Sequence, residues 1–345
     1  MYLGAGLLDD LAGLVERHLP GRRLVMITDR NVARALTFPL PIPTLVVAAG
    51  ERSKTRRRWA DLIDRLLAMG YGRDTAIIAF GGGVVGDLGG FVAATFLRGV
   101  PWLAVPTTLL AMVDASIGGK TGVDTPFGKN LVGAFHPPAA VVADSLTLRT
   151  LPEPVFRAGL AEAVKHGLVA DAAFLEWLGR EAEAITRRDD ATLARLIHRA
   201  AEIKAEIVSA DEFEAGQRAA LNAGHTVAHA IELVSGYAVP HGEAVAIGLL
   251  AEAALAVELG RADAELPEAL EGLLKRLGLP TILPPEFQVD DLLRAMEHDK
   301  KNRDGMIRFA LPTATGRMAR DGERWTVPAA AVQIGAALRS VRSEG

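Results

Sequence analysis

Short apolar runs alternate with a helical pattern in the front half of the chain. The runs have the length and the aliphatic content of buried strands. They cover residues 23–29, 44–48, 75–80, 102–105 and 140–143. After the second run, residues 59–69 repeat apolar positions at the spacing of an amphipathic helix. Because strands that alternate with helices form parallel sheets, we predict an α/β domain with a Rossmann-like parallel sheet over residues 1–151.

The pattern changes in the back half of the chain. Pro152 and Pro154 mark a boundary, after which long stretches are rich in Ala, Leu and Glu. Helical periodicity predicts six helices, at residues 154–169, 173–186, 191–209, 216–234, 242–259 and 266–277. A short strand is predicted at 306–311. We therefore expect an all-α second domain over residues 152–345, with the active site in the cleft between the two domains.

The composition narrows the class of protein. The chain has 345 residues, of which 50% are hydrophobic and 23% charged, as in an ordinary soluble enzyme. A net charge of −4 argues against general nucleic-acid binding. Cysteine is absent, which excludes disulfides, a thiol nucleophile and thiolate metal ligands. Asp9 and Asp10 near the start argue against a signal peptide, and no apolar run is long enough to span a membrane. We expect a cytoplasmic enzyme.

Four polar residues share one face of the helix predicted at 216–234, because they are spaced by four, three and four residues. They are Arg218, Asn222, His225 and His229. Such groups are costly to bury among small apolar neighbours unless a ligand needs them. His241 follows in the next motif, and neutral imidazole is a common ligand for zinc-like metals. Gly224 weakens the predicted helix, which is explained if something approaches its backbone closely.

The alternative is that these histidines are solvated or hydrogen-bonded without a metal. Histidines four apart on a helix are often of that kind, and the Glu of the H-E-x-x-H metalloprotease motif is missing. The accompanying Arg218, Asn222 and third histidine favour the wall of a metal-containing active site. Spacing alone does not choose between His225 and His229 as a ligand.

A glycine-rich segment follows the third predicted strand. Residues 81–87 contain G-x-G-x-x-G between a strand and an apparent helix, where backbone amides can approach a pyrophosphate. The alternative is a purely structural tight turn. No acid lies at the usual distance after this motif to hold a ribose, but Asp29 ends an earlier strand and could do so.

Three other groups of residues carry candidate chemistry. Thr107 and Thr108 end a predicted strand, and residues 114–130 form a long glycine-rich loop with two lysines. Glu162 and Lys165, three residues apart, share a helix face. Such a pair is usually solvated, but its apolar flanks favour an inward orientation.

The ordered set of motifs resembles the 3-dehydroquinate synthase family over nearly the full chain. No single motif is decisive, whereas the series in one order is specific. The series runs Gly50-Glu51-x-x-Lys54, Gly81-Gly82-Gly83-x-x-Gly86-Asp87, Phe96-Leu97-Arg98-Gly99-Val100, Pro106-Thr107-Thr108, Ser116-Ile117-Gly118-Gly119-Lys120-Thr121-Gly122, Gly128-Lys129-Asn130, Leu160-Ala161-Glu162-x-x-Lys165, Asn222-x-Gly224-His225-Thr226 and His241-Gly242-Glu243.

The resemblance implies a role for each matched position. The implied metal ligands, for one Zn or Co ion, are Glu162, His225 and His241. The implied NAD contacts are Asp29, Asn31, Gly50, Glu51, Lys54, Gly83, Val84, Val85, Gly86, Asp87, Thr107, Thr108, Lys120, Lys129, Thr147 and Thr150. The implied catalytic and substrate contacts are Arg98, Asp114, Lys120, Asn130, Lys165, Lys204, Arg218, Asn222 and His229. Arg98 would reach the substrate phosphate of a partner subunit in a homodimer, and either Lys300 or Lys301 would also touch substrate.

The reaction implied by the resemblance belongs to aromatic amino acid biosynthesis. It converts 3-deoxy-arabino-heptulosonate 7-phosphate into 3-dehydroquinate and phosphate. Transient oxidation at C5 by NAD acidifies the neighbouring C–H, phosphate leaves by β-elimination, and reduction, ring opening and an intramolecular aldol step follow. NAD is recycled, and the departing phosphate can serve as its own base.

Three other functions remain open from sequence alone. A metal-dependent polyol or alcohol dehydrogenase of the same plan would accumulate NADH. Another sugar phosphate cyclase would differ only in residues of the substrate pocket. A non-catalytic NAD-binding module would have no use for the full set of metal and lysine positions.

Overall fold

The computed structural model describes residues 1–297 and 306–342. The chain divides into two compact units, which we describe separately. The first unit comprises Met1–Phe156 together with Leu193–Ala201, and the second comprises the rest of the described chain. Lys300 and Lys301, of which one was predicted to touch substrate, lie outside the described residues.

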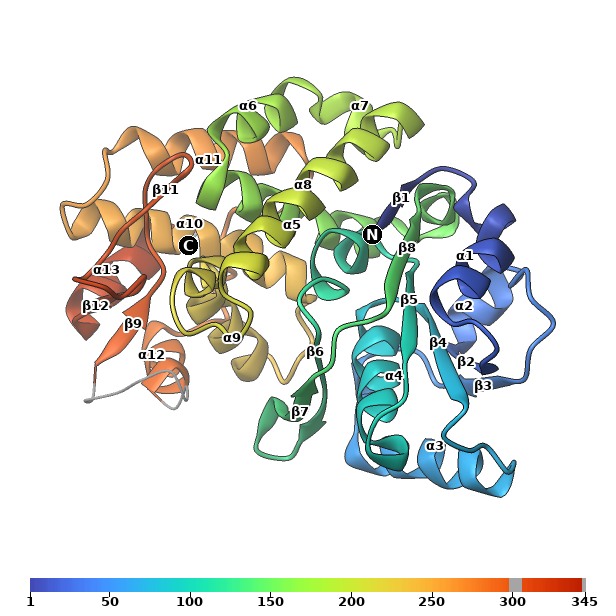
Figure 1. Cartoon of the computed structure of the whole chain (residues 1–345). Helices are drawn as coiled ribbons and strands as arrows, with labels where there is room; N and C mark the ends of the chain where they lie inside the picture. The colour runs from blue at the N-terminus through green and yellow to red at the C-terminus, as the bar shows by residue number, and fades with distance from the viewer. Residues whose placement is uncertain (298–305, 343–345) are drawn as a thin grey trace. The chain divides into compact units, whose positions relative to one another are not determined.

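The first unit is built on a six-stranded parallel sheet, which confirms the predicted α/β architecture (Figure 1). The strand order is β1-β8-β5-β4-β2-β3. The strands are β1 (Tyr2–Gly4), β2 (Arg23–Asp29), β3 (Thr44–Val47), β4 (Thr75–Gly81), β5 (Trp102–Pro106) and β8 (Ala140–Asp144). Five of them coincide with the predicted apolar runs. The three-residue β1 is too short to show a period and was missed.

Helices cover both faces of this sheet (Figure 1). They are α1 (Leu11–His18), α2 (Arg30–Ala35), α3 (Arg56–Ala68) and α4 (Gly83–Thr95). Alternate residues of β4 point to opposite faces. Ile77 belongs to the core cluster that contains residues of α3 and α4, whereas Ile78 belongs to the cluster with residues of α1 and α2. A strand buried on both sides explains why β4 is apolar at almost every position.

The order of the strands reverses beside β2. The chain passes from β2 to β3 on one side, and then returns to β4, β5 and β8 on the other. In open parallel sheets, ligands bind outside the carboxyl ends of the strands at such a reversal. Asp29 at the end of β2 and Gly81 at the end of β4 flank this point.

The glycine-rich segment 114–130 is not a long loop as predicted, because most of it belongs to an antiparallel hairpin. β6 (Lys120–Thr125) pairs with β7 (Gly128–Phe135). A Cβ atom at Gly122 would lie 2.7 Å from the carbonyl oxygen of Val132. The glycines therefore allow the two strands to approach closely, a use that sequence cannot distinguish from loop flexibility.

The second unit is mainly helical as predicted, and the short strand predicted at 306–311 is present, although the unit is not strictly all-α. Two small two-stranded sheets accompany the helices, formed by β9 (Ile307–Phe309) with β12 (Val327–Ala329) and by β10 (Pro312–Ala314) with β11 (Arg317–Met318). The helices of this part of the chain are α5 (Glu153–Ala170), α6 (Ala172–Arg180), α7 (Ala182–Thr186), α8 (Asp190–Ala210), α9 (His225–Val234), α10 (His241–Glu258), α11 (Glu265–Arg276), α12 (Val289–Glu297) and α13 (Ala331–Ser340).

The helix predicted at 216–234 is interrupted. Gln217–Asn222 forms a 3-10 helix, and α9 begins only at His225. Gly224 between them has φ +78°, a left-handed conformation that side chains rarely adopt. The expected close approach is real, since a Cβ atom on Gly248 of α10 would lie 2.0 Å from the Gly224 carbonyl oxygen. Gly224 is thus the cap of a helix, not a residue inside one.

Candidate active site

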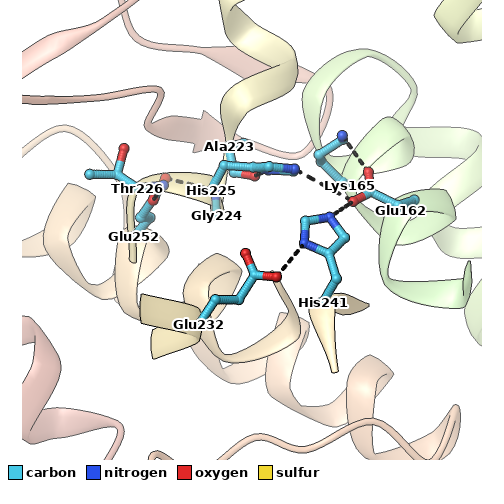
Figure 2. A network of polar contacts seen from close by, with 9 residues as sticks. All are labelled: Glu162, Lys165, Ala223, Gly224, His225, Thr226, Glu232, His241 and Glu252. Carbon is cyan, nitrogen blue, oxygen red and sulfur yellow. Dashed lines mark hydrogen bonds and ion pairs between the residues drawn. The ribbon is translucent and has the colours of Figure 1, made fainter. Parts of the chain in front are cut away.

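Three side chains of the ligand type meet in the second unit (Figure 2). Glu162 comes from α5, while His225 and His241 are the first residues of α9 and α10. The Nε2 atoms of His225 and His241 lie 3.6 Å and 3.4 Å from Glu162 Oε1. Ligands about 2.0–2.2 Å from a tetrahedral zinc ion lie roughly 3.3 Å apart. Both distances to Glu162 therefore fit one zinc-like ion, and all three donor atoms lie within 4.8 Å of one another.

Both imidazoles are oriented by their other ring nitrogen. His225 Nδ1 lies 3.1 Å from the carbonyl oxygen of Ala223, and His241 Nδ1 lies 3.5 Å from Glu232 Oε1. Each ring consequently presents Nε2 to Glu162, as Figure 2 shows. A backbone carbonyl or carboxylate behind a histidine is the usual arrangement that orients a metal-binding ring.

The two histidines differ in their protonation. Burial lowers the pKa of His225 well below its usual value, and the nearby Lys165 ammonium lowers it further, so that this ring is neutral. Burial also lowers the pKa of His241, but hydrogen bonds to Glu162 and Glu232 outweigh this effect and raise it to about 9. Metal binding at neutral pH would therefore release a proton from His241.

Lys165 lies against the same carboxylate. It is 2% exposed and forms an ion pair with Glu162, which is 1% exposed. The inward orientation favoured by the apolar flanks of this pair is confirmed. Its ammonium group adds a fixed positive charge next to the three ligand-type side chains.

The other residues predicted to contact substrate in this unit are more dispersed. His229 lies one turn after His225 on α9, with its ring edge-on and the ring centroids 5.5 Å apart. Arg218 is buried and donates to the carbonyl oxygen of Glu212, while Asn222 Nδ2 donates to Glu214 Oε1 at 2.6 Å. Lys204 is buried on α8. The break at Gly224 separates Arg218 and Asn222 from the helix that carries the histidines, so the predicted single face was wrong.

Sequence reasoning missed two buried carboxylates. Glu232 of α9 contacts His241, and Glu252 of α10 accepts hydrogen bonds from the backbone at the start of α9. They are 2% and 0% exposed. The available signal was an acidic residue inside an apolar helical stretch, which requires a buried partner.

In the first unit, glycines occupy the turn before α4 and the first position of the helix. A Cβ atom at Gly82 would lie 2.9 Å from Thr108 Cγ2, whereas one at Gly86 would meet nothing within 4 Å. Gly83, Val84 and Val85 begin the helix after this turn. A helix N-terminus that a phosphate can approach closely fits the pyrophosphate of a dinucleotide.

A buried lysine forms ion pairs beside this turn. Lys54 Nζ is 2.6 Å from Asp87 Oδ2 of α4 and 3.6 Å from Glu51 Oε1. Burial lowers the pKa of Lys54, but the charges of Asp87 and Glu51 more than compensate, and the pKa is raised overall. The ammonium is therefore charged. This pair fixes the segment that begins at Gly50 against α4.

The remaining predicted cofactor contacts make hydrogen bonds to the backbone at the ends of strands and the starts of helices. Asp29 caps α2 by accepting from the backbone N–H groups of Asn31 and Val32 at 2.7 and 3.0 Å. Thr107 follows β5, and its N–H donates to the carbonyl oxygen of Gly81. The buried hydroxyl of Thr147 donates to the carbonyl oxygen of Asp144, and Thr150 Oγ1 donates to the carbonyl oxygen of Thr147.

The hairpin and two turns hold the last predicted residues of the first unit. Lys120 begins β6, while Lys129 and Asn130 lie in β7. The backbone N–H of Asn130, whose φ is +54°, donates to Asp124 Oδ1 at 2.9 Å. Asp114 lies in a π-helical turn at Ala111–Ala115, and Arg98 is exposed with φ +72°.

Comparisons with known proteins agree with this arrangement. The family model for the 3-dehydroquinate synthase N-terminal domain matches residues 44–158, and that for the C-terminal domain matches residues 159–302. The 3-dehydroquinate synthase of Xanthomonas oryzae pv. oryzae is 48% identical over 91% of this chain and 90% of its own. That of Symbiobacterium thermophilum is 46% identical over 95% of this chain and 97% of its own.

Two solved structures of other synthases share the fold. A 2-deoxy-scyllo-inosose synthase complexed with carbaglucose-6-phosphate, NAD+ and Co2+ has a TM-score of 0.89, with 27% identity over 99% of this chain and 96% of its own. A 2-epi-5-epi-valiolone synthase from Streptomyces hygroscopicus subsp. jinggangensis, with NAD+ and Zn2+ bound, has a TM-score of 0.86, with 27% identity over the same shares of the two chains. The chain belongs to the 3-dehydroquinate synthase family.

Proposed function

We propose that the protein converts 3-deoxy-arabino-heptulosonate 7-phosphate into 3-dehydroquinate and phosphate, using recycled NAD and one divalent metal ion. The observation that carries this proposal is the group of the buried Glu162 with His225 and His241, and with the buried Lys165 beside it, in a chain of this family. Three protein ligands leave coordination positions open for substrate oxygens, as a catalytic site requires. When bound, the metal ion would act as a Lewis acid toward the oxygen at C5.

The residues of the second unit would bind the anionic substrate. We assign Lys165, Lys204 and Arg218 to its negative charges, and Asn222 to its hydroxyl groups. The buried Lys165 ammonium favours negative charge that develops on the substrate oxygen, because a preorganised charge in a dry site acts strongly. His229 is assigned to hydrogen bonding or proton handling at a substrate hydroxyl.

The residues of the first unit would bind NAD and complete the substrate contacts. When bound, NAD would supply reversible hydride transfer at C5. The start of α4 would bind the pyrophosphate, and Asp29 would hold a ribose through the carboxylate that also caps α2. Lys54 and Asp87 would hold the cofactor-binding segment in place, while Lys120, Lys129, Asn130 and Asp114 would lie toward cofactor and substrate.

A coupled assay tests this function. The purified protein, loaded with Zn2+ or Co2+, is expected to release phosphate from the heptulosonate phosphate without net accumulation of NADH. A steady rise in NADH would indicate a polyol or alcohol dehydrogenase. Phosphate release from another sugar phosphate, but not from this one, would indicate a different cyclase.

We further propose a homodimer in which Arg98 acts on the substrate of the partner subunit. The exposed side chain of Arg98 follows Leu97, and both residues have left-handed backbone conformations, with φ +72° and +49°. Strain of this kind is retained where it presents a functional group. In a mixture of inactive Arg98→Ala and Lys165→Ala proteins, random exchange would restore about one quarter of the wild-type sites. No restoration would place Arg98 in its own subunit's site.

The cytoplasmic location of the protein stays a prediction.

A further inference from the structure

Glu252 forms a buried connection between the two helices that begin with the histidine ligands. It belongs to α10 and is 0% exposed. Its carboxylate accepts hydrogen bonds from the backbone N–H groups of Gly224 at 2.7 Å, Thr226 at 3.1 Å and Val227 at 3.3 Å. Figure 2 shows it beside this backbone, at the start of the helix that carries His225. One side chain thus binds the residues on both sides of a proposed metal ligand.

The start of α9 cannot be capped in the ordinary way. The capping position is Gly224, which has no side chain to accept from the first N–H groups of the helix. A larger residue is excluded there, because its Cβ atom would lie 2.9 Å from Leu249 Cγ and 3.0 Å from Leu249 N. Glu252 therefore supplies from the neighbouring helix the acceptor that Gly224 lacks.

A charged acceptor has an effect that a neutral cap would not have. The N-terminus of a helix carries a partial positive charge of about half an elementary charge. Both His225 and His241 are first residues of helices, so a divalent cation held by them would lie near two positive poles. Glu232 places a carboxylate behind His241, and Glu252 places one on the first turn of α9. Each pole is thereby offset by a buried negative charge.

We infer that Glu252 is a positioning residue for the metal site, which holds the first turn of α9 and offsets its positive end so that His225 Nε2 can bind a divalent cation. The inference depends on the metal site of the proposed function. It adds a requirement that none of the matched motifs contains.

Glu252→Gln is the direct test, because glutamine keeps the size and one acceptor oxygen but loses the charge. Zinc affinity is measured by competition with a chromophoric chelator, and the visible spectrum of the Co2+-loaded protein reports the ligand geometry. We expect zinc affinity to fall about 10- to 100-fold, as for other residues that orient metal ligands. The Co2+ spectrum is expected to change as well.

Ile231→Ala is the matched control, since Ile231 is a fully buried residue of α9, the helix that Glu252 caps, and its truncation destabilises that helix without removing the cap. Its zinc affinity and Co2+ spectrum are expected to match those of the wild type. A Glu252→Gln protein that loses stability as the control does, but keeps zinc affinity and spectrum, would overturn the inference. If Glu252→Gln does not fold, Glu252→Asp replaces it, with the same expectation of weaker zinc binding than the control. A wild-type protein that binds no zinc would instead overturn the metal site itself.

Discussion

A single methyl group at Gly248 should disturb the metal site through the contact between α9 and α10. The added Cβ atom would lie 2.0 Å from the carbonyl oxygen of Gly224, and real Cβ contacts stay above about 3.0 Å. α9 and α10 would therefore have to separate locally by about 1 Å. Because the neighbouring atom is backbone, no side-chain rotation can relieve the contact.

The magnitude follows from two opposing effects. Overpacking of this kind costs about 1–3 kcal/mol, and the rigid neighbour puts Gly248→Ala at the upper end. Alanine regains about 1 kcal/mol of helix propensity, which leaves a net loss of about 2 kcal/mol. Gly272→Ala in α11 is the matched control, because its Cβ atom would meet nothing within 4 Å. That variant should be stabilised by up to about 1 kcal/mol.

Urea denaturation of both metal-free variants measures the difference in their free energies of unfolding. We expect Gly248→Ala to be about 3 kcal/mol less stable than Gly272→Ala, the sum of the two effects above. Its zinc affinity should also fall, since the displaced turn carries His225 next to Gly224. Equal stability and equal zinc affinity in the two variants would refute the reasoning that α10 sets the position of this ligand.

Three further predictions concern the site directly. Lys165→Ala should lose at least about a hundredfold in kcat/KM, because the charge of Lys165 acts from a buried position. Lys275→Ala is the control and should keep its activity, because the Lys275 side chain is 58% exposed in a surface ion pair. Equal activities of the two variants would contradict the assignment of Lys165. Chelation should abolish turnover and added Zn2+ or Co2+ should restore it, so full activity in metal-free protein would exclude the proposed metal role. In metal-free protein, the raised pKa of His241 contributes stability below pH 6.5 that is lost as the pH rises through about 9. Urea denaturation across that range should show the decline, and His241→Gln should show a smaller one.

The sequence predicts the sheet better than it predicts the helix starts. Each central strand is a continuous apolar run, because it is buried on both faces, and its limits show in the sequence. The break at Gly224 does not show in the sequence, since the helical period continues through it and its close contacts, with Gly248 and Leu249, come from another helix. Contacts between elements that are distant in sequence decide where such a helix begins.

The proposed set of metal ligands could be assigned only through the family resemblance. Spacing placed His225 and His229 equally well, and the structure brings His225 with Glu162 and His241 into one group. An acid inside an apolar stretch signals only that a buried partner exists, and the partners of Glu232 and Glu252, the His241 imidazole and the backbone N–H groups at the start of α9, could not be identified from sequence. Residues 114–130 were misread for a related reason, since glycine allows close strand pairing as readily as a loop.

All three proposed ligands come from helices α5, α9 and α10, and none from the sheet of the other unit. Zinc at a thousand times its dissociation constant would add about 4 kcal/mol to the stability of whatever part of the chain it holds together. That gain falls on the helical unit alone. Proteolysis of metal-starved protein should therefore begin among these helices and spare the sheet. The supply of the ion would then set the lifetime of the protein as well as its catalytic rate.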